Sequence, residues 1–164
     1  MQPLVRTGLT RRTYLASLIA LYRPHALLEA AVANAAARLG LDDEMALSPS
    51  RLPSLQDDIS MLGGELPGLC EADSSDIDTP MALVGQRYVL EGSRLGGQLI
   101  ARRIGEMLGP DVSRRFFGAP APDVHWRGFL VFAEYHCPPG ETAAAVVAAQ
   151  TAFTDFLARL DDTR

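Results

Sequence analysis

The stretch YVLEGSRLGGQLIARR, residues 88–103, decides the fold that this sequence predicts. Apolar side chains in it and beside it recur at intervals of four, as in Leu95 and Leu99 and in Ile100 and Ile104, which indicates a helix. Three glycines nonetheless fall within six residues of its middle. Each glycine inside a helix costs about 1 kcal/mol relative to alanine, so these three give up roughly 3 kcal/mol of helix propensity. Such a stretch is expected where something must lie closer to the backbone than a Cβ atom allows.

The glycines of this region lie on one side of the predicted helix. Gly85, Gly92 and Gly96 are separated by seven and four residues, so they share a face, with Ser93 and Gly97 beside it. We expect the helix to bend where the glycines cluster. A bare strip of this kind can face a neighbouring helix at short distance, or a flat ligand that lies over exposed backbone. The spacing favours the helix seam and leaves both interpretations open.

The remaining periodicity is also helical. We find no convincing strand alternation, no internal repeat and no low-complexity tract, so the sequence predicts one all-α domain, 1–164, as a compact multi-helix bundle with antiparallel neighbours. The expected helix boundaries rest on capping residues and on proline and glycine positions. The first helix is expected to start after Thr10, to be kinked or split by Pro24 and to end at Gly40. A short helix follows at 55–62, and Pro80 opens the glycine helix. A short element at 112–117 and two helices, one from Asp123 and one at 141–160, complete the chain.

Composition excludes several classes of protein. The net charge of −5 argues against a nucleic-acid binder that works by neutralising phosphates. All fifteen basic residues are arginines. Two cysteines, Cys70 and Cys137, provide neither a disulfide framework nor a clustered metal site. No apolar run reaches spanning length and no signal peptide opens the sequence, which predicts a soluble, cytoplasmic protein without a membrane partner.

The residues at 88–97 resemble the distal helix of bacterial, biliverdin-producing heme oxygenases. The resemblance continues on both sides of this helix. Residues 9–29, with Leu9-Thr10 at their start, are similar to the family's second conserved helix, and residues 57–63 resemble the short element before the distal helix. Residues 126–129 and 148–153 are similar to the family's C-terminal helices. The resemblance therefore covers nearly the whole chain, in order.

The resemblance implies a helical fold that holds heme between a proximal and a distal helix, with heme as both substrate and cofactor. Oxygen and electrons from an external donor, such as a ferredoxin or a flavin reductase, would convert it to biliverdin, CO and iron. By this resemblance the distal catalytic wall comprises Gly92, Ser93, Gly96 and Gly97, and heme contacts come from Tyr88, Leu95 and Arg127. Arg127, and less directly Arg114 or Arg115, would pair with the propionates, although exposed arginines are an equal alternative. Glu91 lies between Arg87 and Arg94 at helical spacing, which predicts a solvated ion-pair face.

The proximal iron ligand is not identifiable in the sequence. The family's ligand is a histidine on a helix before the Leu9-Thr10 region, and here no histidine precedes His25. We expect either that the start of the chain was cut short or that this member has lost the ligand. His25 is a weak candidate, because using it would leave too few residues before Gly96 for the second helix. Cys137, before a proline, and His125 and His136, at the ends of one helix, are weaker still.

Three functions follow in order of preference. The first is a heme oxygenase that binds heme and, where an axial ligand is available, cleaves it to biliverdin. The second is a degenerate heme-oxygenase-like binding or regulatory module without turnover. The third is another enzyme on the same helical fold, such as a thiaminase-like hydrolase, which ranks last because the sequence shows no nucleophilic triad or carboxylate pair.

Overall fold

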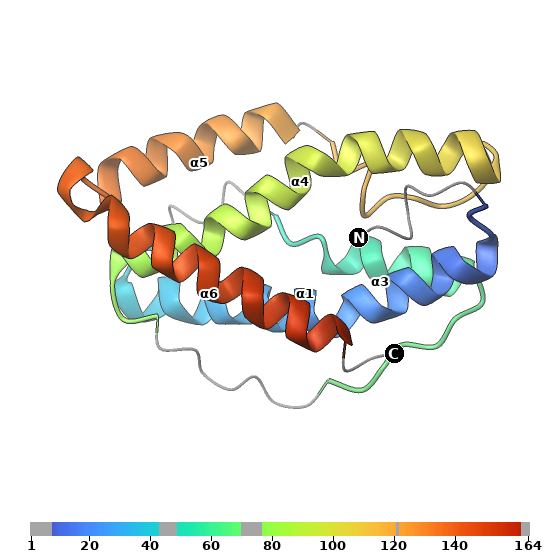
Figure 1. Cartoon of the computed structure of the whole chain (residues 1–164), viewed down its shortest axis with the longest axis horizontal. Coiled ribbons are helices and arrows are strands. Elements are labelled where there is room, and N and C mark those ends of the chain that lie inside the picture. Colours follow the sequence, from blue (N-terminus) through green and yellow to red (C-terminus); the bar gives the residue numbers. More distant parts are fainter. Residues whose placement is uncertain (1–7, 43–48, 70–76, 121, 162–164) are drawn as a thin grey trace.

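The computed structural model describes residues 8–42, 49–69, 77–120 and 122–161. Within these ranges the regular structure is entirely helical and contains no β-strand, which confirms the prediction of an all-α bundle (Figure 1). The elements are α1 (Arg11–Leu39), α3 (Leu52–Met61), α4 (Pro80–Leu108), α5 (Pro122–His136), the 3₁₀ turn η2 (Pro139–Glu141) and α6 (Thr142–Asp161).

The ends of α1 follow from local chemistry. The Thr10 side chain accepts a hydrogen bond from the Thr13 backbone N–H at 3.2 Å, and the Thr13 hydroxyl accepts one from the Thr10 N–H at 2.9 Å. This reciprocal capping box satisfies donors that the first turn leaves free. Gly40 ends the helix in the left-handed conformation, with φ of 69°. The sequence predicted that Pro24 would kink or split the helix; Pro24 lies inside a continuous helix, so the split does not occur.

The apolar character of α1 is relevant to the prediction that the protein has no membrane partner. By length and composition alone it could cross a membrane, and it is the one such helix in the described part of the chain. Of its most apolar 18-residue window, 44% is buried inside the protein. Tyr14, Leu18 and Leu21 of this helix pack in the core. Buried core helices of soluble proteins share these properties, so the cytoplasmic location stays a prediction.

α4 is the central element of the bundle. It starts with Pro80 at its first position and with the Thr79 hydroxyl accepting from the Ala82 N–H at 3.2 Å, as the sequence predicted for Pro80. It packs against α1, α5 and α6. Figure 1 shows that α4 changes direction near its middle, as expected for a helix with clustered glycines.

The segment between α4 and α5 forms turns in place of the short element predicted at 112–117. It is anchored by Asp58 of α3, which is fully buried. The Asp58 carboxylate accepts hydrogen bonds from the Ser113 hydroxyl at 2.5 Å and from the backbone N–H groups of Arg115 and Phe116 at 3.0 Å. These contacts hold Phe116 and Phe117 in the core.

The predicted solvated face around Glu91 is wrong. Arg87, Glu91 and Arg94 are only 1%, 3% and 6% exposed. Glu91 lies 3.3 Å from the Arg94 Nε, and Arg94 also donates to the Pro49 carbonyl at 2.8 Å. The Arg87 guanidinium stacks over the Phe132 ring at 4.5 Å. Ion pairing and aromatic stacking allow these charges to be buried between elements, a context that helical spacing does not reveal.

Candidate ligand-binding cleft

A large apolar cleft lies among α1, α4, α5 and α6. Its volume is about 1390 Å³, above the roughly 300–1,000 Å³ of most small-molecule sites. Each helix contributes apolar side chains, such as Leu28 from α1, Val89 from α4, Phe129 from α5 and Phe153 from α6. Phe116, placed by the Asp58 anchor, completes one wall. A cleft of this size and composition suits a large apolar ligand.

In the middle of the glycine strip, the α4 backbone itself forms part of the cleft surface, which we call the bare floor. Gly92 and Gly96 both line it. A Cβ atom built at either position would meet nothing within 4 Å among the described residues. The α4 backbone is therefore open to the cleft at these two points, and a flat molecule could lie directly against it.

The outer parts of the strip are packing seams, although Gly85 also lines the cleft. A Cβ atom at Gly85 would lie 2.2 Å from the Ala145 carbonyl oxygen of α6, and one at Gly97 would lie 2.7 Å from the Phe117 carbonyl oxygen. Both distances are too short for any residue with a side chain, so these glycines permit close contact with neighbouring backbone. The two interpretations of the strip thus apply to different glycines of one helix.

Of the other residues predicted to contact a ligand, some line the cleft and others lie outside it. Tyr88 and Ser93 line the cleft, and the Tyr88 ring packs near Trp126, with ring centroids 5.8 Å apart. Leu95 and Arg127 are exposed and are not among the lining residues. The predicted propionate candidates Arg114 and Arg115 also lie elsewhere. Arg114 donates to the carbonyl oxygens of residues 110 and 112, and Arg115 pairs with an exposed carboxylate on α3.

His25 lies in the wall of the cleft and is 2% exposed. Its Nε2 lies 2.9 Å from Glu29 Oε1, and its ring meets Phe116 edge-on at 4.9 Å between centroids. Burial lowers the pKa of His25 below its usual value, against the hydrogen bond to Glu29, so the imidazole is neutral at pH 7. Because Glu29 is ionised and can only accept, Nε2 carries the proton and Nδ1 keeps the lone pair.

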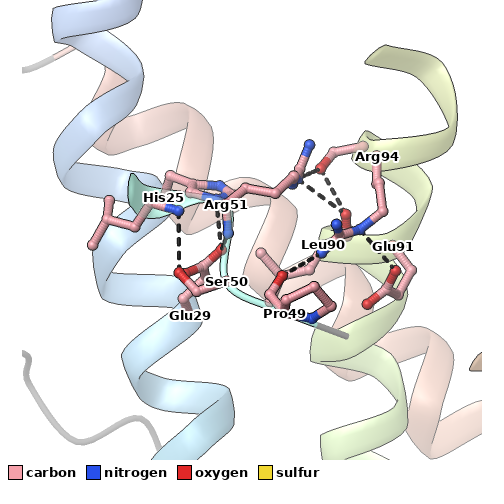
Figure 2. Close-up of polar contacts among 10 residues, drawn as sticks. His25, Glu29, Pro49, Ser50, Arg51, Leu90, Glu91 and Arg94 are labelled. Atoms are coloured by element: carbon pink, nitrogen blue, oxygen red, sulfur yellow. Dashed lines mark hydrogen bonds and ion pairs between the residues drawn. The ribbon is translucent and has the colours of Figure 1, made fainter. Parts of the chain in front are cut away.

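Glu29 connects α1 to the segment before α3. Besides His25, its carboxylate accepts hydrogen bonds from the Ser50 hydroxyl and from the Arg51 backbone N–H at 2.9 Å (Figure 2). Burial acts to raise the pKa of Glu29, but the hydrogen bonds from His25, Ser50 and Arg51 outweigh it and lower that pKa to about 2. Both carboxylate oxygens thus accept hydrogen bonds from protein donors.

Arg51 also lines the cleft, and sequence reasoning missed it. Its side chain is nearly buried and extends to α4, where Nη2 donates to the Leu90 carbonyl at 3.3 Å and to the Ser93 hydroxyl at 2.5 Å (Figure 2). Burial, followed by the charge of Arg94, lowers the pKa of Arg51 to about 10, so it stays charged at neutral pH. An arginine before a proline-containing helix carries no sequence signal that separates it from a surface arginine.

No family model, characterised protein or solved structure matched this chain in comparison. The likeness to heme oxygenases therefore stays a prediction from the sequence. In the described ranges, no group of three or more His, Cys, Asp and Glu side chains could hold a free metal ion.

Proposed function

We propose that this protein is a heme-oxygenase-like protein that binds heme in the cleft, with the α4 backbone at Gly92 and Gly96 against one porphyrin face. One observation carries the proposal. Both glycines face open space inside an apolar cleft of about 1390 Å³, so a flat ring can approach the helix closely. Burial of apolar surface contributes about 25 cal/mol per Å², and a porphyrin has a large apolar area to bury.

The residues present fit the porphyrin better than they fit its iron. The apolar walls and the bare backbone suit the ring. His25 is the one histidine that lines the cleft in the described ranges, and it is neutral, as an iron ligand must be. Its Nε2, however, is held by Glu29 at 2.9 Å, which leaves Nδ1 as the nitrogen with a lone pair. When bound, heme would supply the oxygen chemistry that yields biliverdin, CO and iron, with electrons from an external donor such as a ferredoxin or flavin reductase.

Ser93 helps to position the Arg51 side chain in the wall of the cleft. Its hydroxyl donates to the Leu90 carbonyl at 2.7 Å and accepts from Arg51, so its proton is committed to the helix backbone. The chain's own contributions to catalysis would then be the bare floor at Gly92 and Gly96 and the exclusion of water by the apolar walls.

A non-catalytic heme-oxygenase-like binding or regulatory module is the second candidate function. The observation that favours it is the engaged Nε2 of His25, since an iron without a fixed axial ligand does not hold oxygen productively. The two candidates share the ligand and differ in turnover.

Hemin binding is tested by titration followed by absorbance. The wild-type protein should produce a sharp Soret band that responds to CO. Gly96→Leu fills the open space over α4 and should abolish that band while the protein stays folded. Gly128→Leu is the matched control, because Gly128 is also a helical glycine with nothing within 4 Å of its Cβ position, yet it lies outside the cleft lining. Loss of hemin binding in both variants, or in neither, would contradict the proposal.

Turnover is tested by biliverdin formation from hemin with a reducing partner, with and without imidazole. We expect weak activity that added imidazole raises, because the His25 Nε2 is engaged by Glu29. Equal and substantial activity in both conditions would make His25 the iron ligand, and His25→Ala would then remove it. A Soret band without biliverdin in either condition would select the binding module.

A further inference from the structure

We propose that Arg51 is a carboxylate-binding residue inside the cleft, so that the ligand is an apolar molecule whose acid group points inward, toward the junction of α1, α3 and α4. The proposal deepens the proposed function, since heme carries two propionates, and it specifies how such a ligand is oriented. It rests on the burial, charge and unused donors of Arg51.

The Arg51 guanidinium is a buried cation without a carboxylate partner. Its residue is 3% exposed, and no ion pair within 4 Å joins it to an acidic side chain in the described ranges. Glu29 and Glu91 lie near enough to favour the charged form of Arg51, but burial and the charge of Arg94 outweigh them and lower its pKa. Glu29 itself accepts from His25, Ser50 and the Arg51 backbone, and Glu91 pairs with Arg94. A buried charge is costly unless it is paired, so this site would gain from an incoming anion.

Three of the five N–H donors of Arg51 remain for a ligand. Both hydrogen bonds that the guanidinium makes use Nη2, to Leu90 and Ser93. Nη1 and Nε have no partner among the described residues, and the side chain lines the cleft. The guanidinium Cζ lies over the Phe116 ring, 4.8 Å from its centroid, and this cation–π contact helps to hold the side chain in place. A guanidinium held in this way presents donors that match the two oxygens of a carboxylate.

The remaining cleft makes the position of the acid group specific. Among the lining residues in the described ranges, Arg51 is the one cation and Glu134, on α5, is the one acid, while most of the other lining side chains are apolar. A ligand carboxylate would therefore be attracted to the Arg51 wall and would be disfavoured near Glu134. Arg127, which the sequence suggested for this role, is exposed and outside the cleft, so a carboxylate directed toward it would leave the cleft.

The test compares hemin with its dimethyl ester, which lacks the charged propionates, by Soret titration. The wild-type protein should bind hemin about tenfold more tightly than the ester or better, the ratio expected when one charge-assisted hydrogen-bonding site is lost. Arg51→Met should lower hemin affinity by a similar factor and leave ester affinity unchanged. Arg51→Lys should restore part of the preference, and Arg127→Met, the matched control, should behave as wild type.

The outcomes separate this proposal from the proposed function. Equal binding of hemin and ester by the wild-type protein overturns the role of Arg51 and leaves heme binding intact. This comparison needs no variant, so it holds even if Arg51→Met fails to fold. If neither porphyrin binds, the proposed function fails, and a fluorescent fatty acid and its methyl ester become the probes for Arg51. A preference for the free acid that Arg51→Met removes would then support the carboxylate site, and no preference or no binding would overturn it.

Discussion

Replacing single glycines of α4 with alanine should change stability in opposite directions at adjacent positions. Gly96→Ala adds a methyl group to open space, because nothing lies within 4 Å of its Cβ position among the described residues. Gly97→Ala places the same methyl group 2.7 Å from the Phe117 carbonyl oxygen. Both positions lie inside α4, so both variants gain the same helix propensity.

The magnitude follows from these distances. Alanine is favoured over glycine inside a helix by about 1 kcal/mol, so Gly96→Ala should stabilise the protein by about that amount. At Gly97 the backbone of Phe117 must shift, and it is restrained because Gly118 N–H donates to the Arg114 carbonyl at 2.8 Å. Overpacking of this kind costs about 1–3 kcal/mol. The difference between the two variants isolates this steric cost, because the propensity gain cancels.

Urea unfolding followed by circular dichroism measures the difference, with the slope of the transition checked for constancy. The midpoint of Gly96→Ala should rise and that of Gly97→Ala should fall relative to wild type. Gly85→Ala should fall further, since its Cβ would lie 2.2 Å from backbone of α6. Equal stabilisation of Gly96→Ala and Gly97→Ala would refute the assignment of open floor and packing seam.

Three further predictions concern stability. Asp58→Ala should cost about 3 kcal/mol, because a buried carboxylate that accepts three hydrogen bonds is lost. Asp57→Ala, which removes an exposed ion pair, should cost under about 1 kcal/mol, and similar losses in both variants would contradict the role of Asp58 in holding the 112–117 turns. The free energy of unfolding should decrease as pH falls from 7 toward 5, because the pKa of His25 lies below its usual 6.5 only in the folded state, so the unfolded chain takes up the proton first. His25→Gln should flatten that slope, and an unchanged slope would refute its origin. Thr10→Ala should cost about 1 kcal/mol by urea titration, whereas Ser17→Ala, which removes a half-buried hydroxyl that caps no helix end, should cost less.

The helices could be predicted from sequence where their ends depend on local chemistry. Thr10, Gly40 and Pro80 act through backbone groups within a few residues, so composition and spacing around them suffice. The all-α class follows from the same periodicities. The turns at 112–117 could not be predicted, because their conformation depends on Asp58, which lies more than fifty residues earlier in the chain.

The candidate site was predicted in part, for a related reason. Spacing placed Gly92, Ser93, Gly96 and Gly97 on a common region of α4, and the first three line the cleft whereas Gly97 does not. Burial was not predictable, since Glu91 and its arginine neighbours form the same i, i+3 and i, i+4 pattern on a solvated helix as on this buried one. Arg51 was missed because its importance depends on which elements meet around it, and no short-range pattern records that.

The glycines of α4 provide the strongest physical argument for a ligand. Gly85 and Gly97 each lose about 1 kcal/mol of helix propensity, and each permits a backbone contact that no larger residue could make. Those contacts hold α6 and the Phe117 turn on either side of the open floor. Gly92 and Gly96 lose about 2 kcal/mol together, with nothing of the described protein packed against them in return. Among the described residues nothing offsets this cost, and a flat ligand against the α4 backbone would do so.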